Sequence, residues 1–209
     1  MAGAGIKGNR ARGRIEMEEK AMKFGGIEFG GKLGGYELTN QSTEKLPQDL
    51  ASAVCKVFKE NGMLGASYEP MWYLGSQIVN GTNHLLICLQ TRLTKENDKK
   101  IVGVVINIPA GSIGGNDAKI VEVISDEDLI EGTNLDLGIR EKFERAMNGL
   151  IGVSYKPVMY VGSQVVKGMN YYIVAEARLM YPNSEPYAAM VCINEFEGNV
   201  GLIGIEKLK

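Results

Sequence analysis

Apolar residues in the first half of the chain recur first at helical and then at strand spacing. From Leu46 to Phe58 they return every three or four positions, with Pro47 in the first turn and Asn61-Gly62 at the end. Runs rich in β-branched and aromatic residues follow, divided by Gly, Asn, Asp and Pro. These runs cover about residues 67–80, 82–94, 99–108 and 118–124. The pattern predicts one amphipathic helix followed by four consecutive strands.

The same order of elements returns in the second half. Five apolar positions mark a helix: Ile139, Phe143, Ala146, Met147 and Leu150. The strands expected after it cover about residues 153–166, 169–181, 187–196 and 200–208. A lone helix of this length is marginal in water, so each helix is expected to pack on a sheet. The prediction is an α+β fold with two domains, each an antiparallel sheet of four to five strands wrapped around one α-helix.

The N-terminal segment has a different character. Residues 1–35 are rich in glycine and show no sustained period, so we expect them to be flexible, with domains at 36–126 and 127–209. Four basic residues and no acidic ones lie within the first 14 positions. A disordered or vector-derived leader is the favoured interpretation, and a nucleic-acid-binding arm is the alternative.

The two halves share a duplicated sequence. Residues 68–83 read YEPMWYLGSQIVNGTN and residues 155–170 read YKPVMYVGSQVVKGMN, with 9 of 16 positions identical at a constant spacing of 87. A period this long is outside the range of solenoid and propeller repeats, which indicates two copies of a small domain.

Each copy centres on a predicted hairpin turn. Asn-Gly is a strong hairpin signal because both residues tolerate positive φ, and the second copy has Lys-Gly at the same place. A short apolar side chain and a glycine lose little conformational entropy when they insert into a partner's cleft. We therefore take two sets of five residues as candidate binding residues. They are Gln77, Ile78, Val79, Asn80 and Gly81 in the first copy, and Gln164, Val165, Val166, Lys167 and Gly168 in the second.

Composition narrows the expected partners and location. A net charge of -2 gives no general attraction to nucleic acid or to an anionic membrane surface, and there is no apolar run long enough for a membrane span. The three cysteines, Cys55, Cys88 and Cys192, do not match between the copies and lie within apolar patterns. A disulfide framework is therefore not expected, and a cytoplasmic location is.

The order of helix, long strand, Q-x-V-x-G hairpin and further strands resembles the cystatins, the inhibitors of papain-like cysteine proteases. The resemblance covers about residues 34–125 and 134–208, and the lack of a disulfide framework makes the chain most similar to the intracellular stefin branch. It implies two cystatin-like domains in tandem. It also implies a papain-like cysteine protease as the partner, with reversible tight inhibition and no cofactor.

The resemblance further implies a binding wedge of three parts. The first is a trunk glycine, for which Gly34 or Gly35 is the candidate, although either could be one more glycine of the leader. The second is the hairpin. The third is a later loop, for which Pro109 is the candidate, with an ordinary turn proline as the alternative. At the corresponding place the second copy offers only Glu197 to Asn199, so the first copy is expected to be the better inhibitor.

Two other functions remain open from the sequence. A cystatin-fold adaptor would use the same hairpins on a partner that is not a protease. A small-molecule enzyme would need a buried carboxylate, and the single histidine, His84, is interpreted as a sheet or rim residue and not as a base. The spacing of Cys and His does not suggest zinc, and the sequence does not define an oligomeric state.

Overall fold

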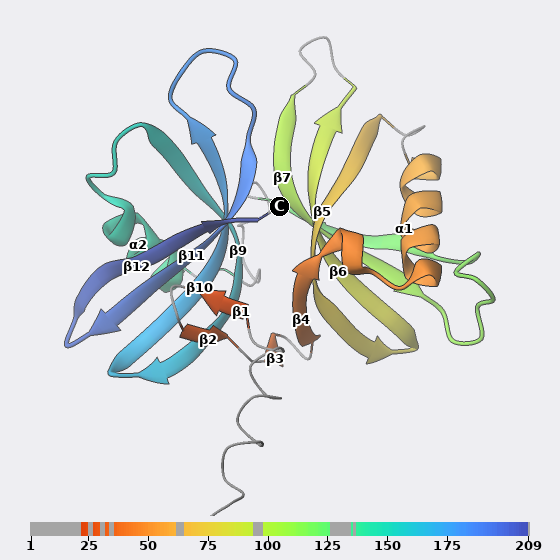
Figure 1. The fold of residues 1–209 in the computed structure, drawn as a ribbon, viewed down its shortest axis with the longest axis horizontal. Helices are drawn as coiled ribbons and strands as arrows, with labels where there is room; N and C mark the ends of the chain where they lie inside the picture. Colours follow the sequence, from red (N-terminus) through yellow and green to blue (C-terminus); the bar gives the residue numbers. More distant parts are fainter. Residues whose placement is uncertain are drawn as a thin grey trace, which may run out of the picture.

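The chain forms an α+β structure in which two antiparallel sheets are each accompanied by one helix (Figure 1). This is a computed structural model, and it describes residues 22–24, 27–29, 32–33, 36–61, 65–93, 98–125, 135 and 137–208. We call residues 36–125 unit 1 and residues 135–208 unit 2. Within the described residues, neither helix is long and apolar enough to cross a membrane.

Unit 1 contains one helix and most of a six-stranded sheet. The helix is α1 (Gln48–Asn61), preceded by a short 3-10 turn, η1 (Thr43–Lys45). The sheet has the order β3-β4-β5-β6-β7-β8. Its strands are β3 (Lys32–Leu33), β4 (Tyr36–Ser42), β5 (Ala66–Val79), β6 (Gly81–Arg92), β7 (Lys99–Ile108) and β8 (Lys119–Ile124).

Unit 2 repeats the helix and four strands. The helix is α2 (Leu137–Met147), and the sheet has the order β12-β11-β10-β9. Its strands are β9 (Val153–Val166), β10 (Gly168–Leu179), β11 (Tyr187–Phe196) and β12 (Asn199–Lys207). The eight strands expected from the sequence in the two units are therefore present, with ends that agree within two residues.

The structure also contains strands that the sequence pattern did not predict. Strand β4 pairs with β5 in the sheet of unit 1. Within the segment expected to be flexible, β1 (Met22–Phe24) pairs with β2 (Ile27–Phe29), and β3 pairs with β4. Part of that segment is therefore strand.

The central strands of unit 1 are apolar on both faces. Leu86 and Cys88 pack with the apolar face of α1, in a cluster that includes Val54 and Phe58. Successive side chains of a strand point to opposite faces, so the alternate position Ile87 packs toward the other sheet. A long apolar run such as LLICL is typical of strands that are covered on both sides.

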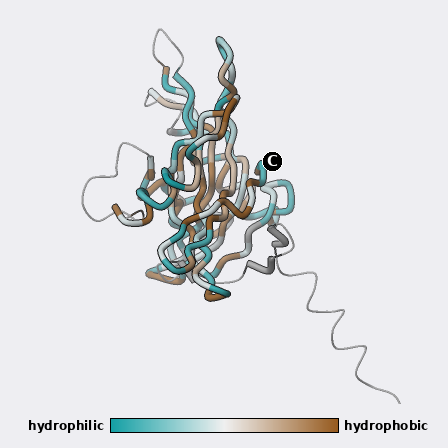
Figure 2. Tube along the Cα trace, turned by 90° about the vertical axis from the view of Figure 1, so that its left-hand side faces the viewer, coloured by the Kyte–Doolittle hydropathy of each residue, from teal (hydrophilic) through white to brown (hydrophobic). Residues whose placement is uncertain are grey.

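The two sheets pack against each other through a shared core. This cluster joins side chains of both units, among them Leu74 and Leu85 from unit 1 with Val174 and Met190 from unit 2. The helices lie on the outer faces, so the layers run α1, first sheet, second sheet, α2 (Figure 1). Apolar residues accordingly concentrate along the middle of the strands (Figure 2). The two units therefore share one hydrophobic core and are not independently packed domains.

Polar side chains of unit 2 bind the backbone at the start of β7, where β7 pairs with β6 but not with β8. The backbone N–H of Ile101 donates to the buried carboxylate of Glu176 at 3.0 Å, and Arg178 donates to the carbonyl of Lys99 at 3.0 Å. The side chain of Lys99 also pairs with Glu185. Because β7 runs from Lys99 toward Ile108, this cluster lies at the end of the sheets opposite to the Q-x-V-x-G hairpins.

Candidate functional site

The Q-x-V-x-G segments form the turns of two hairpins. In unit 1, Val79 faces Gly81 across the turn and Gly81 has a φ of +105°, a value that side-chain-bearing residues rarely adopt. Ile78 points outward and is 88 % exposed. Both hairpins lie at the lower end of the molecule in Figure 1, one on each sheet, so two exposed apolar tips project from the same end.

Gly81 brings the first hairpin against the loop that follows β7. A Cβ atom added to Gly81 would lie 2.2 Å from the carbonyl oxygen of Ile108 and 2.7 Å from the Cα of Pro109. Backbone therefore touches backbone, which glycine alone permits. The structure places Pro109 directly beside the hairpin turn, and these two loops form what we call edge 1.

The equivalent contact in unit 2 has a different second loop. Gly168 has a φ of +93°, and a Cβ atom there would lie 2.1 Å from the carbonyl oxygen of Glu195. The next residue, Phe196, lies under the Lys167 amine, which is 5.0 Å from the ring centroid. We call these two loops edge 2. Phe196, which ends β11 one residue before Glu197, therefore lies at edge 2, and the sequence interpretation did not include it.

The first part of the predicted wedge lies outside the described residues. Gly34 and Gly35 stand in the sequence between β3 and β4, and neither is described by the structure. The start of β4 is described: Glu37 faces Ser76, at the same end of the sheet as edge 1. Strand β4 reaches this position because Gly75 has no side chain, since a Cβ there would lie 2.2 Å from the carbonyl oxygen of Glu37.

A row of asparagines lies beneath each turn. Asn107 donates to the side-chain oxygen of Asn83 at 2.8 Å in unit 1, and Asn194 donates to that of Asn170 at 2.8 Å in unit 2. Asn194 also donates to the carbonyl of Lys167 at 3.4 Å. In unit 2 the row is thereby hydrogen-bonded to the backbone of the turn.

These asparagines are functional candidates that the sequence interpretation missed. Both members of each pair recur at the spacing of 87 that defines the duplication, so this spacing could have found them. The row continues to the glutamines, since Gln77 faces Asn83 and Gln164 faces Asn170.

The remaining neighbours of the turns differ between the units. In unit 1 the Tyr73 hydroxyl lies 3.1 Å from Nδ1 of His84, and burial lowers the pKa of His84. In unit 2 the position of His84 is occupied by Tyr171, whose hydroxyl donates to Glu195 at 3.0 Å. Lys142 pairs with the same carboxylate at 3.5 Å. The strands next to edge 1 thus carry the pair Tyr73 and His84, whereas edge 2 has the ion pair of Lys142 and Glu195 beside it.

Both edges present exposed aliphatic side chains, backbone groups and amides. Within the described residues, no group of three or more His, Cys, Asp or Glu side chains is placed to hold a metal ion. The buried thiol of Cys192 has its pKa raised by desolvation to about 11.

Searches against models of known protein families and against curated protein sequences found no match to this chain.

Proposed function

We propose that this chain is a reversible inhibitor of papain-like cysteine proteases, built from two cystatin-like units. Edge 1 is the stronger site and edge 2 a weaker or separate one. On this proposal Gln77, Val79 and Gly81, with Gly35 and Pro109, carry the first site. Gln164, Val166 and Gly168 carry the second. The three free cysteines make a reducing compartment, the cytoplasm, the expected location of the inhibitor.

The observation that carries the proposal is the contact between Gly81 and the loop at Pro109. Two neighbouring loops at one sheet end make a narrow wedge, and the outermost side chain of that wedge, Ile78, is apolar and almost fully exposed. Val79 beside it is also exposed, so the turn presents adjoining apolar side chains to solvent. The same arrangement recurs in unit 2, where Val165 is 79 % exposed.

Inhibition would follow from occupation of the protease cleft. The wedge would fill the cleft on both sides of the reactive cysteine without placing a peptide bond for cleavage. Since both turns are hairpins fixed by ladder hydrogen bonds, little ordering is needed on binding, and a small contact area can give tight binding. The inhibitor itself needs neither a general base nor a metal.

The test is a titration of active papain with the purified chain. The remaining protease activity is measured as the rate of hydrolysis of a fluorogenic peptide. We expect tight inhibition that saturates at one or two equivalents of protease per chain. No inhibition at micromolar chain, with circular dichroism showing a folded protein, would overturn the proposal. That outcome would favour an adaptor that uses the same hairpins on another kind of protein.

A further inference from the structure

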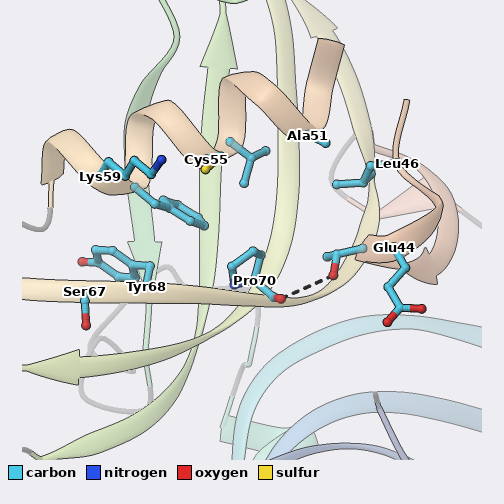
Figure 3. Close-up of a pocket in the computed structure, with 11 residues that line it drawn as sticks. Glu44, Leu46, Ala51, Cys55, Lys59, Ser67, Tyr68 and Pro70 are labelled. Carbon is cyan, nitrogen blue, oxygen red and sulfur yellow. Dashed lines mark hydrogen bonds between the residues drawn. The ribbon is translucent and has the colours of Figure 1, made fainter. Parts of the chain in front are cut away.

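A cavity of about 560 Å³ lies between α1 and the first half of β5 (Figure 3). Most of its walls are apolar. They include Leu46, Val54, Phe58, Tyr68 and Pro70. At about 3.3 Å per residue, the distance along β5 from Pro70 to the hairpin turn at Val79 is about 30 Å. The cavity is therefore separate from edge 1.

The cavity has the size and lining of a small-molecule site. Ligand pockets enclose about 300–1,000 Å³ and combine apolar walls with a few polar groups. Phe58 from the helix and Tyr68 from the strand form one wall, with ring centroids 5.5 Å apart. The Thr43 hydroxyl donates to the carbonyl of Pro70 at 3.3 Å, which fixes the opposite end.

Unit 2 offers a natural comparison for this cavity. Tyr155 and Pro157 occupy the positions of Tyr68 and Pro70, and they line a crevice of about 470 Å³ beside α2. The helix side of that crevice carries Arg140 and Glu144, whose side chains pair at 3.1 Å. The lining thus has a larger polar share in unit 2 than in unit 1, so the largely apolar lining is a property of unit 1 and not of the architecture.

The polar groups of the cavity define one charged end. Lys59 extends from α1 toward Cys55, and Ser67 lies on the strand below (Figure 3). Glu44 lies at the far end, where it would repel a second anionic group. We propose that the cavity binds an amphipathic monocarboxylate. The aliphatic chain lies against Phe58 and Pro70, and the carboxylate pairs with Lys59.

Cys55 provides a direct readout of occupancy. It lines the cavity and is exposed, whereas Cys88 and Cys192 are buried. Iodoacetamide is a neutral reagent and should therefore alkylate Cys55 selectively in the folded chain. Octanoate is expected to slow this reaction in a saturable manner. An alkylation rate that octanoate leaves unchanged would overturn the proposal.

A chain-length and head-group series tests the chemistry of the ligand. Burial of one methylene changes affinity about fourfold, so affinity should rise by about that factor per carbon from hexanoate to octanoate. Octan-1-ol should bind about threefold more weakly than octanoate, because a partly exposed ion pair contributes modestly. Lys59→Gln should remove the preference for octanoate over octan-1-ol. A preference that survives this change would contradict the assignment of the head-group position.

A pair of helix variants separates the cavity from the surface of α1. Ala51→Phe places a ring inside the cavity, since Ala51 is one of its lining residues, and should abolish protection of Cys55. Asp49→Phe adds the same ring at an exposed position of α1 that lines neither this cavity nor the hollow beside Cys55, and should leave protection intact. Equal protection in both variants would overturn the proposal. Circular dichroism of both proteins verifies that the fold is retained.

Discussion

In unit 1 the hairpin turn stands beside residues 109–118, a loop that opens with Pro109. In unit 2 it stands beside a turn of two residues, Glu197 and Gly198, with φ values of 51° and 77°. Two consecutive positive φ angles are typical of the tight turns that match strand twist. The second loop of edge 1 can therefore reach further than that of edge 2, while the turns that both loops contact are alike.

The difference shows which parts of the duplicated edge are interchangeable. Both copies keep the positive-φ glycine, the close backbone contact and the asparagine row. The side chains around them differ, with Asn80 and Pro109 in edge 1 and Lys167 and Phe196 in edge 2. The shared parts fix the shape of the wedge, and the differing parts would set its target and strength.

The largest effect is expected from the two turn glycines. Gly81→Ala places a Cβ 2.2 Å from the Ile108 oxygen at a positive φ, and Gly168→Ala does the same at Glu195. Backbone strain of this kind costs about 1–3 kcal/mol, and the clash must also displace the neighbouring loop. Each variant should lose one site in the papain titration, so the inhibition that remains reports the other edge.

Gly149→Ala, after α2 and outside both edges, is the matched control for the glycine variants. Its φ is +88°, but a Cβ there would have no atom within 4 Å. It should therefore carry the strain without the clash and keep the inhibition of the parent. If Gly81→Ala inhibits as well as the parent while Gly168→Ala does not, the assignment of the stronger site is reversed.

The second loops should give the next largest effect. Pro109→Ala, measured in the Gly168→Ala background, should weaken inhibition at edge 1 about tenfold, as truncation of a central interface residue does. Phe196→Ala in the Gly81→Ala background also removes the contact with the Lys167 amine and should weaken edge 2 by a smaller factor. Inhibition constants for papain provide the measurement. Unchanged constants in both would mean that the second loops do not contact the protease.

A smaller effect, on stability, is expected from the asparagine rows. Asn194→Ala leaves the oxygen of Asn170 without its donor, and Asn170 is only 2 % exposed. An unsatisfied buried acceptor costs about 1–3 kcal/mol. Asn107→Ala should cost less because Asn83 is half-buried and can turn to water. Urea unfolding of the two variants measures the difference, and an equal loss in both would contradict the role of burial.

The strands of each unit could be predicted closely because their signals are local. The alternation of side chains and the Asn-Gly and Lys-Gly turns are contained in each segment. Strand β4 was missed because its sequence, YELTNQS, is mostly polar. Its place depends on the close approach at Gly75, which lies more than 30 positions away.

The packing of the two sheets was a second omission, although the sequence carried a signal for it. A sheet with one face on a helix and one in water should alternate between apolar and polar residues, yet Leu85 to Leu89 is an unbroken apolar run.

Comparison of the copies at a spacing of 87 beyond the hairpin would also have aligned Pro109 with Phe196. The role of Gly34 or Gly35 as the trunk glycine of the wedge remains a prediction.

The smallest effect should be a pH dependence of stability that arises from His84 in unit 1. Burial lowers the pKa of His84 below its usual 6.5, so below that pH the unfolded chain binds a proton that the folded chain does not. The stability of the fold should therefore decrease as the pH falls below about 6.5, the ordinary pKa of histidine. His84→Gln should remove this component, as measured by urea midpoints at pH 7.5 and pH 5.5. Unit 2 has Tyr171 at this position and so lacks this titrating group. An equal pH dependence of stability in parent and variant would show that a group other than His84 titrates.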